Sequence, residues 1–343
     1  MPMKASIFSI LTVCLMLAAC TKSADENFEH FYLRNGNADL YVEINGNIAS
    51  KVFFIYLHGG PGGGSLAYNS GYFAEEMEAD YAMVYLDQRG NGASQGINEE
   101  EDLTIAQNSE DIYQLAQILQ AKYGDDISIF LAGHSWGGLT SAHALLNTEI
   151  QSILRGWVEM NGAHDFPLND VEAVKMFQTL GQQEIDAGNN LDFWEPVVER
   201  VNQIDINNIT EEDSGYMNSK GFEAEGMFDL ADEEITGVIP HGLAAPQLSL
   251  ATLAANGAVN GILNEDSNQY ALTDQLNQIE IPCLFLWGKY DFVVPPALGV
   301  SAFARVGTNE KQLIIYERSG HSPMSNEAIQ FTQDVKDFIE LYK

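Results

Sequence analysis

A serine stands at the centre of the pentapeptide G-H-S-W-G at 133–137, between a run that reads as a buried strand and a run that reads as a helix. The strand is expected over 127–132 and the helix over 139–146. A strand, a tight glycine turn bearing serine and a helix together form a nucleophile elbow, which exposes the hydroxyl on a sharp turn. Glycines two residues before and after the serine leave out side chains that would block the reversal. The pattern predicts that Ser135 is a nucleophile.

Three further motifs follow predicted strands. The glycine-rich run H-G-G-P-G-G-G at 58–64 comes after an apolar strand, Asp291 follows another in G-K-Y-D, and His321 follows a third in S-G-H-S-P. Functional sites of open α/β sheets lie at the carboxyl ends of the strands. We therefore expect these groups to meet Ser135 at one edge of a sheet.

The division of labour follows from proton affinities. A serine hydroxyl is a poor nucleophile by itself, so His321 would take its proton and later pass it to the leaving group. Asp291 would hold the imidazole in the required tautomer. The oxyanion of a tetrahedral intermediate needs fixed N–H donors, for which the backbone of Trp136 and that of Gly60 are the candidates.

Other residues compete for these roles. Asp165 follows the strand predicted over 155–160 and could supply the acid in place of Asp291. The run D-Q-R-G at 87–90 is predicted to be a turn locked by an arginine–carboxylate pair, and thus scaffold. The remaining candidate histidines are interpreted as hydrogen-bonded structural residues, with His134 packed under the serine: His58, His134, His143, His164 and His241.

Taken together, the motifs resemble the proline iminopeptidase branch of the α/β-hydrolases. The chain order Ser, Asp, His is that of this superfamily, and the resemblance covers roughly residues 30–341. H-G-G-P-G at 58–62 and S-W-G-G at 135–138 narrow it towards the branch. One departure concerns the substrate: members with firm iminopeptidase character read G-G-S-W-G, whereas here His134 precedes the serine, as in many esterases and lipases.

The order of elements agrees with this resemblance. Eight segments have the composition of strands: 30–35, 39–45, 51–57, 81–86, 127–132, 155–160, 282–287 and 311–316. Amphipathic helical runs lie between them, notably over 105–122. Alternating strands and helices imply a mostly parallel sheet with helices on both faces. We predict an α/β-hydrolase fold with an eight-stranded sheet and an inserted helical cap.

The predicted cap is strongly acidic. The core is expected over 30–164 and 251–343, with the cap over 165–250 between them. From 162 to 245 the chain has 18 Asp and Glu against three Lys and Arg. Most of these carboxylates are interpreted as a solvated surface. The resemblance implies that cap glutamates bind a substrate ammonium group, and Glu195 resembles one such position, with less defined candidates at Glu223, Glu225 and Glu233.

The charge of the whole chain limits its partners. A formal net charge of −33, from 16 Lys and Arg against 49 Asp and Glu, argues against nucleic-acid binding, which needs basic patches. We expect no cofactor and no metal, because His-Glu-x-x-His and other ligand spacings are missing and the glycine run lacks the Gly-Lys-Ser/Thr ending of a phosphate loop. The partner is expected to be a small molecule or a short peptide.

The first nineteen residues read as a lipoprotein-type signal peptide. Lys4 gives a positive start, 5–17 form an apolar run too short to span a bilayer, and L-A-A-C at 17–20 resembles a bacterial lipobox. Cleavage before Cys20 and its lipidation would leave 20–29 as anchor and tether, on the periplasmic or outer-surface side of the cell envelope. An ordinary secretory signal is the alternative. Cys283 would then be the remaining cysteine of the mature chain, on a core strand and inert.

Three functions remain open at this point. The first is a serine aminopeptidase of proline iminopeptidase type that acts on short peptides. The second is a carboxylic-ester hydrolase, which His134 and the breadth of the fold favour. The third is a lipid-anchored binding protein without turnover, against which the complete Ser, Asp and His set argues.

Overall fold

One large sheet forms the centre of the molecule. The computed structural model describes residues 28–65, 68–96, 98–230 and 250–343. Within them, the sheet runs in the order β1-β2-β4-β3-β6-β7-β8-β9, and a short strand β5 pairs with β2. The strands are β1 Phe28–Asn35, β2 Ala38–Gly46, β3 Val52–Leu57, β4 Ala82–Leu86, β5 Gln95–Gly96, β6 Ser128–His134, β7 Leu154–Met160, β8 Cys283–Gly288 and β9 Lys311–Tyr316.

The sheet is antiparallel at one edge and parallel elsewhere. β1 and β2 form a hairpin in which Asn35 pairs with Ala38, and the turn between them uses Gly36 at a φ of 60°. β2 then pairs antiparallel with β4. From β4 through β3, β6, β7 and β8 to β9 every pairing is parallel. The carboxyl ends of these six strands therefore share one edge.

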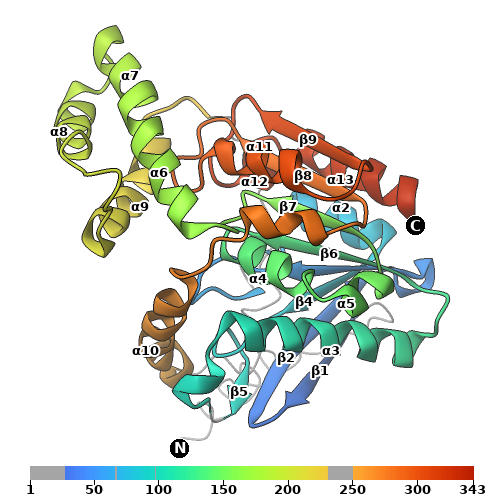
Figure 1. Cartoon of the computed structure of the whole chain (residues 1–343). Helices are drawn as coiled ribbons and strands as arrows, with labels where there is room; N and C mark the ends of the chain where they lie inside the picture. Colours follow the sequence, from blue (N-terminus) through green and yellow to red (C-terminus); the bar gives the residue numbers. More distant parts are fainter. Residues whose placement is uncertain (1–27, 66–67, 97, 231–249) are drawn as a thin grey trace, which may run out of the picture.

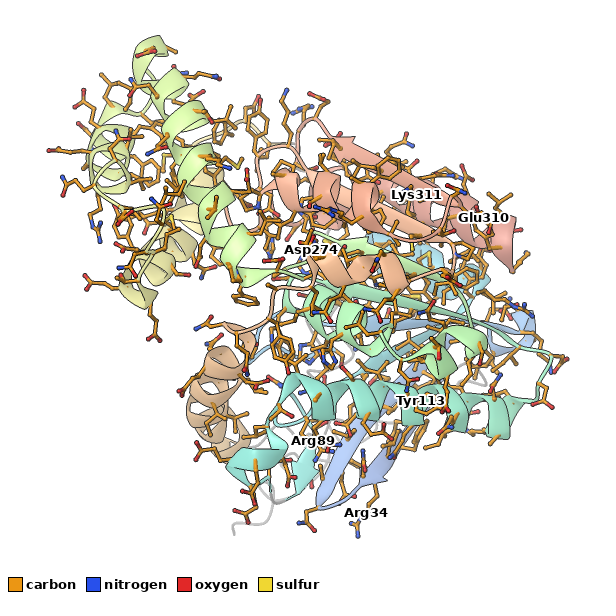
Figure 2. The ribbon with its side chains drawn as sticks, in the orientation of Figure 1. Arg34, Arg89, Tyr113, Asp274, Glu310 and Lys311 are labelled. Carbon is orange, nitrogen blue, oxygen red and sulfur yellow. The ribbon has the colours of Figure 1, made fainter. Side chains whose placement is uncertain are left out.

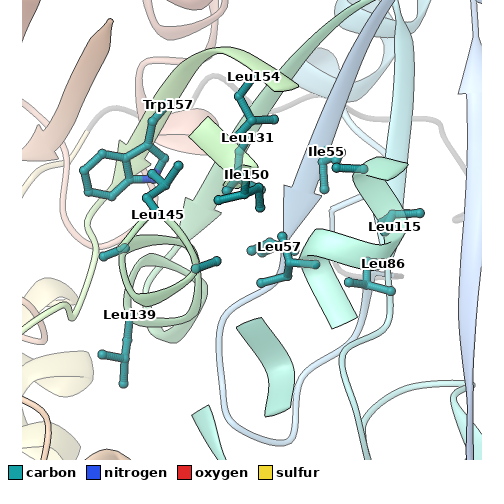
Figure 3. Close-up of a cluster of buried hydrophobic side chains, with 14 of the residues drawn as sticks. Ile55, Leu57, Leu86, Leu115, Leu131, Leu139, Leu145, Ile150, Leu154 and Trp157 are labelled. Atoms are coloured by element: carbon teal, nitrogen blue, oxygen red, sulfur yellow. The ribbon is translucent and has the colours of Figure 1, made fainter. Parts of the chain in front are cut away.

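Helices cover both faces of the sheet (Figure 1). Side chains alternate between the faces along a strand, so Phe53, Ile55 and Leu57 of β3 join one apolar cluster while Phe54 and Tyr56 join the other. The first cluster packs against α3, α4, α5 and α11, and Figure 3 shows part of it. The second packs against α2, α12 and α13. These helices are α2 Tyr72–Asp80, α3 Ile105–Tyr123, α4 Trp136–Ala144, α5 Thr148–Ile153, α11 Pro296–Arg305, α12 Pro323–Asn326 and α13 Ala328–Tyr342.

A separate group of helices, called the cap below, follows β7 and lies outside these layers, green to yellow in Figure 1. Its members are α6 Phe166–Met176, a π-helical turn Phe177–Gly181, α7 Gln182–Ala187, α8 Leu191–Val201 and α9 Glu211–Glu225. The group has an apolar cluster of its own, built around the fully buried Phe177 and Trp194. Phe292, from the loop after β8, also belongs to this cluster and so joins the cap to the core.

The remaining helical segments are α10 and short 3-10 turns. α10, Leu250–Ser267, is tied to the core where Asp266 accepts the N–H of Ile105 at the start of α3. Short 3-10 turns occur at Ile48–Ser50, Glu100–Asp102 and Thr273–Gln278. Within the described ranges, no helix combines the length and the apolar content that crossing a membrane requires.

The α/β-hydrolase fold predicted from the sequence is confirmed. All eight predicted strands are present, with bounds that differ by at most two residues, and the helix predicted over 105–122 is α3. Two details differ. The helix after the serine begins at Trp136 rather than at 139, and the sheet has a ninth strand, β5, whose two exposed residues carry no apolar pattern.

Candidate active site

Ser135 occupies the sharp turn between β6 and α4. Its φ of 56° and ψ of −121° lie where L-residues are seldom found. The flanking glycines make this possible: a Cβ on Gly133 would collide with the carbonyl oxygen of Gly137, and a Cβ on Gly137 would collide with that of Leu57 on β3. Backbone strain of this kind concentrates at functional sites. The geometry is that of the predicted elbow, with a half-buried serine at its tip.

Asp291 and His321 meet at the same edge of the sheet. The His321 Nδ1 lies 2.9 Å from the Asp291 Oδ2, and both side chains are buried. The other oxygen of Asp291 accepts the N–H groups of Val293 at 2.9 Å and Val294 at 2.7 Å. Asn161, from the loop after β7, donates its amide to Oδ2 as well. These bonds fix the carboxylate so that it can hold the imidazole with Nδ1 protonated and Nε2 free.

Electrostatics favour a proton on His321. Burial lowers the pKa of the imidazole, but the charge and hydrogen bond of Asp291, together with the charge of Glu225, outweigh burial and raise the net pKa above its ordinary value. A raised pKa makes the imidazole a better proton acceptor. An imidazole in this environment can act as a general base at pH values above its pKa.

The cap contacts His321 through the last turns of α9. The Glu225 Oε1 accepts the backbone N–H of His321 at 3.0 Å. Burial and the nearby charge of Asp291 raise the pKa of Glu225 to about 7. Phe222, which is 56% exposed, sets its ring perpendicular to the His321 imidazole with 5.8 Å between centroids. One cap helix thus supplies a carboxylate and an aromatic edge to this histidine.

Asp165, the alternative candidate for the acid, lies at the start of α6. Its Oδ1 accepts the N–H of Leu168 as the N-cap of α6, and its Oδ2 accepts the N–H of Thr273. The carboxylate that hydrogen-bonds His321 is that of Asp291. The structure therefore gives Asp165 a local structural function at the start of the cap.

The histidines interpreted as structural are hydrogen-bonded within the core. His58 accepts the Gln88 N–H, and His143 lies 2.8 Å from the Ser109 hydroxyl. His164 pairs with the buried Glu159 at 2.7 Å. His134 packs against the His321 ring, with 4.8 Å between centroids. His241 lies outside the described residues.

The D-Q-R-G turn after β4 is scaffold. Arg89 forms an ion pair with Asp111 of α3 at 2.7 Å, and each side chain is 2% exposed. Asp87 accepts the N–H groups of Ser65 and Ala93, which closes the loops on either side. The predicted arginine–carboxylate lock is present, and its carboxylate belongs to α3.

A cavity of about 290 Å³ opens beside Ser135. Gly60 and Trp136, the two predicted oxyanion donors, both line it. Trp136 is the first residue of α4, so its N–H has no carbonyl partner within the helix. The cap contributes one wall, which includes residues of α6 and α9. Polar side chains around the cavity include Asn169, Asp170, Glu211, Ser214, Asn218, Asn264 and Asn268.

The cap carboxylates are distributed differently from the expectation. Glu195 is exposed on α8 and does not line the cavity that contains Ser135. Glu223 is exposed and pairs with Lys220. Of the four glutamates considered, Glu225 lies against His321, while Glu233 falls outside the described residues.

Asp170 was missed by sequence reasoning. It lines the cavity from α6, accepts a hydrogen bond from Ser214 at 2.7 Å, and has its pKa raised by burial. Its position as the fifth residue of α6, the first helix after β7, was the available signal.

No metal cluster is evident in the part of the chain that the structure describes: three or more His, Cys, Asp or Glu side chains nowhere gather as they would around an ion. Cys283 on β8 is a buried free thiol, and burial raises its pKa well above the ordinary value. Such a thiol is chemically inert. Cys20 lies outside the described residues.

Comparison with known proteins agrees with the fold. Residues 52–193 match the family model of the alpha/beta hydrolase fold. The chain is 23% identical over 304 residues to the probable aminopeptidase YbaC of Bacillus subtilis, an alignment that covers 86% of this chain and 91% of that one. It is 24% identical to the proline iminopeptidase of Saccharolobus solfataricus, covering 92% and 93%.

A solved structure gives the same picture of the fold. The esterase of Exiguobacterium antarcticum superposes with a TM-score of 0.59 at 18% identity, covering 90% of this chain and 98% of that one. The protein is an enzyme with the α/β-hydrolase fold, and over most of its length its sequence is similar to those of a probable aminopeptidase and a proline iminopeptidase.

Proposed function

We propose that the protein is a serine hydrolase with Ser135 as nucleophile, His321 as general base and Asp291 as the residue that orients the base. The observation that carries the proposal is the Asp291–His321 hydrogen bond at the edge where the elbow presents Ser135. A carboxylate–imidazole pair and a serine on a strained strand-to-helix turn are features by which such a triad is recognised, irrespective of fold.

The reaction has two halves. In the first, the His321 Nε2 takes the hydroxyl proton while the Ser135 Oγ bonds to the substrate carbonyl carbon, and the leaving group departs with that proton. In the second, water attacks the acyl-serine carbonyl and gives a proton to the His321 Nε2, which passes it to the Ser135 Oγ as the acid is released. The N–H groups of Trp136 and Gly60 would hold the oxyanion in both halves, and loss of one such donor typically costs about 3–4 kcal/mol of barrier.

A Ser135→Ala variant tests whether the protein is a serine hydrolase. We expect a folded protein that has lost nearly all turnover and no longer reacts with a fluorophosphonate probe. A wild-type protein that hydrolyses neither esters nor arylamides and does not label would instead support the binding-protein alternative.

The substrate class proposed is a short peptide with a free N-terminus. Two supports come from this chain and its relatives: the relatives named as aminopeptidase and proline iminopeptidase, and the Asp170 carboxylate in the cavity beside Ser135. The ion pairs among the described residues do not include Asp170. The Asp170 carboxylate is half-buried, and burial disfavours its charged form, so a substrate ammonium group would be a fitting partner.

The test compares substrates that differ in the amine. Prolyl-, alanyl- and N-blocked arylamides are assayed beside short p-nitrophenyl esters, with Asp170→Asn as the variant. We expect this variant to raise KM at least tenfold for free-amine substrates and to leave ester hydrolysis within about twofold. Glu195→Gln, on the exposed face of α8, is the matched control and should change neither.

Ester hydrolysis is the second candidate. It is favoured by His134 before the serine and by the structural similarity to an esterase. Rapid ester cleavage with no dependence on a free amine would reject the aminopeptidase assignment while leaving the serine hydrolase intact.

We further propose that the enzyme is anchored to the bacterial envelope through a lipid on Cys20. The support is the sequence L-A-A-C at 17–20 after an apolar run. Cys20→Ser should move the protein from the membrane fraction to the soluble fraction. Intact-mass measurement should show the acyl groups on the wild-type protein, and an unmodified mature N-terminus would reject the anchor.

A further inference from the structure

The backbone of His321 is held by a side chain on each side. Its N–H donates to Glu225 of the cap, at 3.0 Å. Its carbonyl oxygen lies 2.7 Å from the Nε2 of His134, the residue directly before Ser135. The position of the imidazole therefore depends on a second histidine that belongs to the elbow itself.

The protons on His134 can be assigned from its partners. A carbonyl oxygen only accepts, so the Nε2 of His134 carries the hydrogen that binds the His321 carbonyl. Burial, with the nearby His321 imidazole, lowers the pKa of His134 to about 3, so the ring is neutral at physiological pH and Nδ1 is an acceptor. The hydroxyl of Tyr68, 2.9 Å away, must donate to that nitrogen.

The chain of bonds continues to the glycine-rich loop. The Tyr68 oxygen accepts the backbone N–H of Gly59 at 3.1 Å. Gly59 precedes Gly60, the proposed oxyanion donor, and a Cβ on Gly59 would lie 3.0 Å from that of Ser135. One directed series of hydrogen bonds thus runs from Gly59 through Tyr68 and His134 to His321.

We infer that His134, oriented by Tyr68, is a positioning residue that sets the His321 imidazole and the Gly59–Gly60 loop relative to Ser135. The inference rests on the proposed serine hydrolase and adds a residue pair that acts through the triad and the oxyanion donor. Neither side chain needs to touch the substrate. Removal of the pair should therefore lower kcat and leave KM unchanged.

Two substitutions at His134 separate positioning from packing. The amide nitrogen of a Gln side chain reaches about as far as Nε2, whereas that of Asn reaches only about as far as Nδ1. His134→Gln can keep the bond to the His321 carbonyl, and His134→Asn cannot. We expect the Gln variant to retain kcat within about threefold and the Asn variant to lose at least tenfold, with KM unchanged in both.

Two tyrosine substitutions test the part of the hydrogen-bond series between Gly59 and His134, one as the variant and one as its control. Tyr68→Phe removes the hydroxyl that joins Gly59 to His134. Tyr56→Phe removes a buried hydroxyl that has no hydrogen-bond partner among the residues that the structure describes, from a ring 4.9 Å from that of Tyr68. We expect Tyr68→Phe to lower kcat at least fivefold and Tyr56→Phe to leave it unchanged.

The readout is the rate of fluorophosphonate labelling beside kcat, KM and the melting temperature. Labelling needs only an activated serine, so it is independent of the peptide or ester assignment. A wild-type protein that labels, with His134→Gln and His134→Asn labelling at equal rates, would overturn the inference alone. Activity losses that follow the melting temperatures would overturn it too. A wild-type protein that does not label would reject the serine hydrolase.

Discussion

Replacing Glu225 by Gln removes one negative charge from the surroundings of His321 and keeps an acceptor for its backbone N–H. His321 must be neutral to take the Ser135 proton, so activity rises as pH increases through its pKa. The charges of Asp291 and Glu225 both raise that pKa. Loss of the Glu225 charge should lower it, and the acid limb of the pH profile should move to lower pH.

The size of the shift follows from the contact. The Glu225 Oε1 accepts the His321 N–H, and a charge at a separation of about 6 Å from the ring would contribute about 1.4 kcal/mol at an effective dielectric of about 40 and about 2.8 kcal/mol at about 20. One pKa unit corresponds to about 1.4 kcal/mol. Because the pKa of Glu225 is itself about 7, it is partly protonated where His321 titrates. The expected shift is therefore about one pH unit.

The assay is kcat/KM between pH 5 and 9 at constant ionic strength, on a p-nitrophenyl ester that carries no ionisable group. The wild-type acid limb reports Glu225 and His321 as a coupled pair, whereas that of Glu225→Gln reports the histidine alone. Glu223→Gln is the matched control, since Glu223 is exposed on the same helix and pairs with Lys220. An unmoved acid limb, or one moved to higher pH, would refute the electrostatic role of Glu225.

Three further substitutions test the scaffold around the site. Asp111→Ala leaves Arg89, which lies beside the start of α3 in Figure 2, charged and buried. It should lower the free energy of unfolding in urea by about 3–5 kcal/mol. The control Asp39→Ala breaks an ion pair at the exposed tip of the hairpin and should lower it by at most about 1 kcal/mol; equal losses would contradict the burial argument. Gly137→Ala places a Cβ against the backbone after β3, and should slow fluorophosphonate labelling at least tenfold; unchanged labelling would show that the elbow tolerates a side chain there. Asp165→Ala should cost about 1 kcal/mol as a lost N-cap and leave kcat within twofold, and a tenfold loss would transfer the acid role to it.

The sequence predicted those parts of the molecule that depend on apolar runs and on strand ends. β3 and β6 are continuous apolar segments because both faces of a parallel sheet are covered. Residues that follow neighbouring parallel strands are brought together by the topology. For that reason His321, after β9, could be expected near Asp291, after β8, although Asp165, after β7, remained an alternative until the structure showed the Asp291–His321 hydrogen bond.

The substrate-facing residues of the cap were less predictable. Its helices have many acidic residues, and only packing decides which of these point toward the site. Glu195 was chosen from its motif, yet Trp194, Val197, Val198 and Val201 form the buried stripe of α8, which turns Glu195 outward. That stripe has helical spacing and could have been used. The contact of Glu225 with His321 joins residues 96 positions apart, and no local pattern encodes it.

α9 has two functions at once: it supplies part of the cavity wall, and its Glu225 accepts the N–H of His321. Any swing of this helix wide enough to admit a substrate would also withdraw that acceptor. In the open molecule His321 would be held less firmly, whereas in the closed molecule it would be held in the position that catalysis requires. Substrate entry and bond cleavage would then alternate, so that Ser135 is activated only while the cavity is closed to bulk solvent.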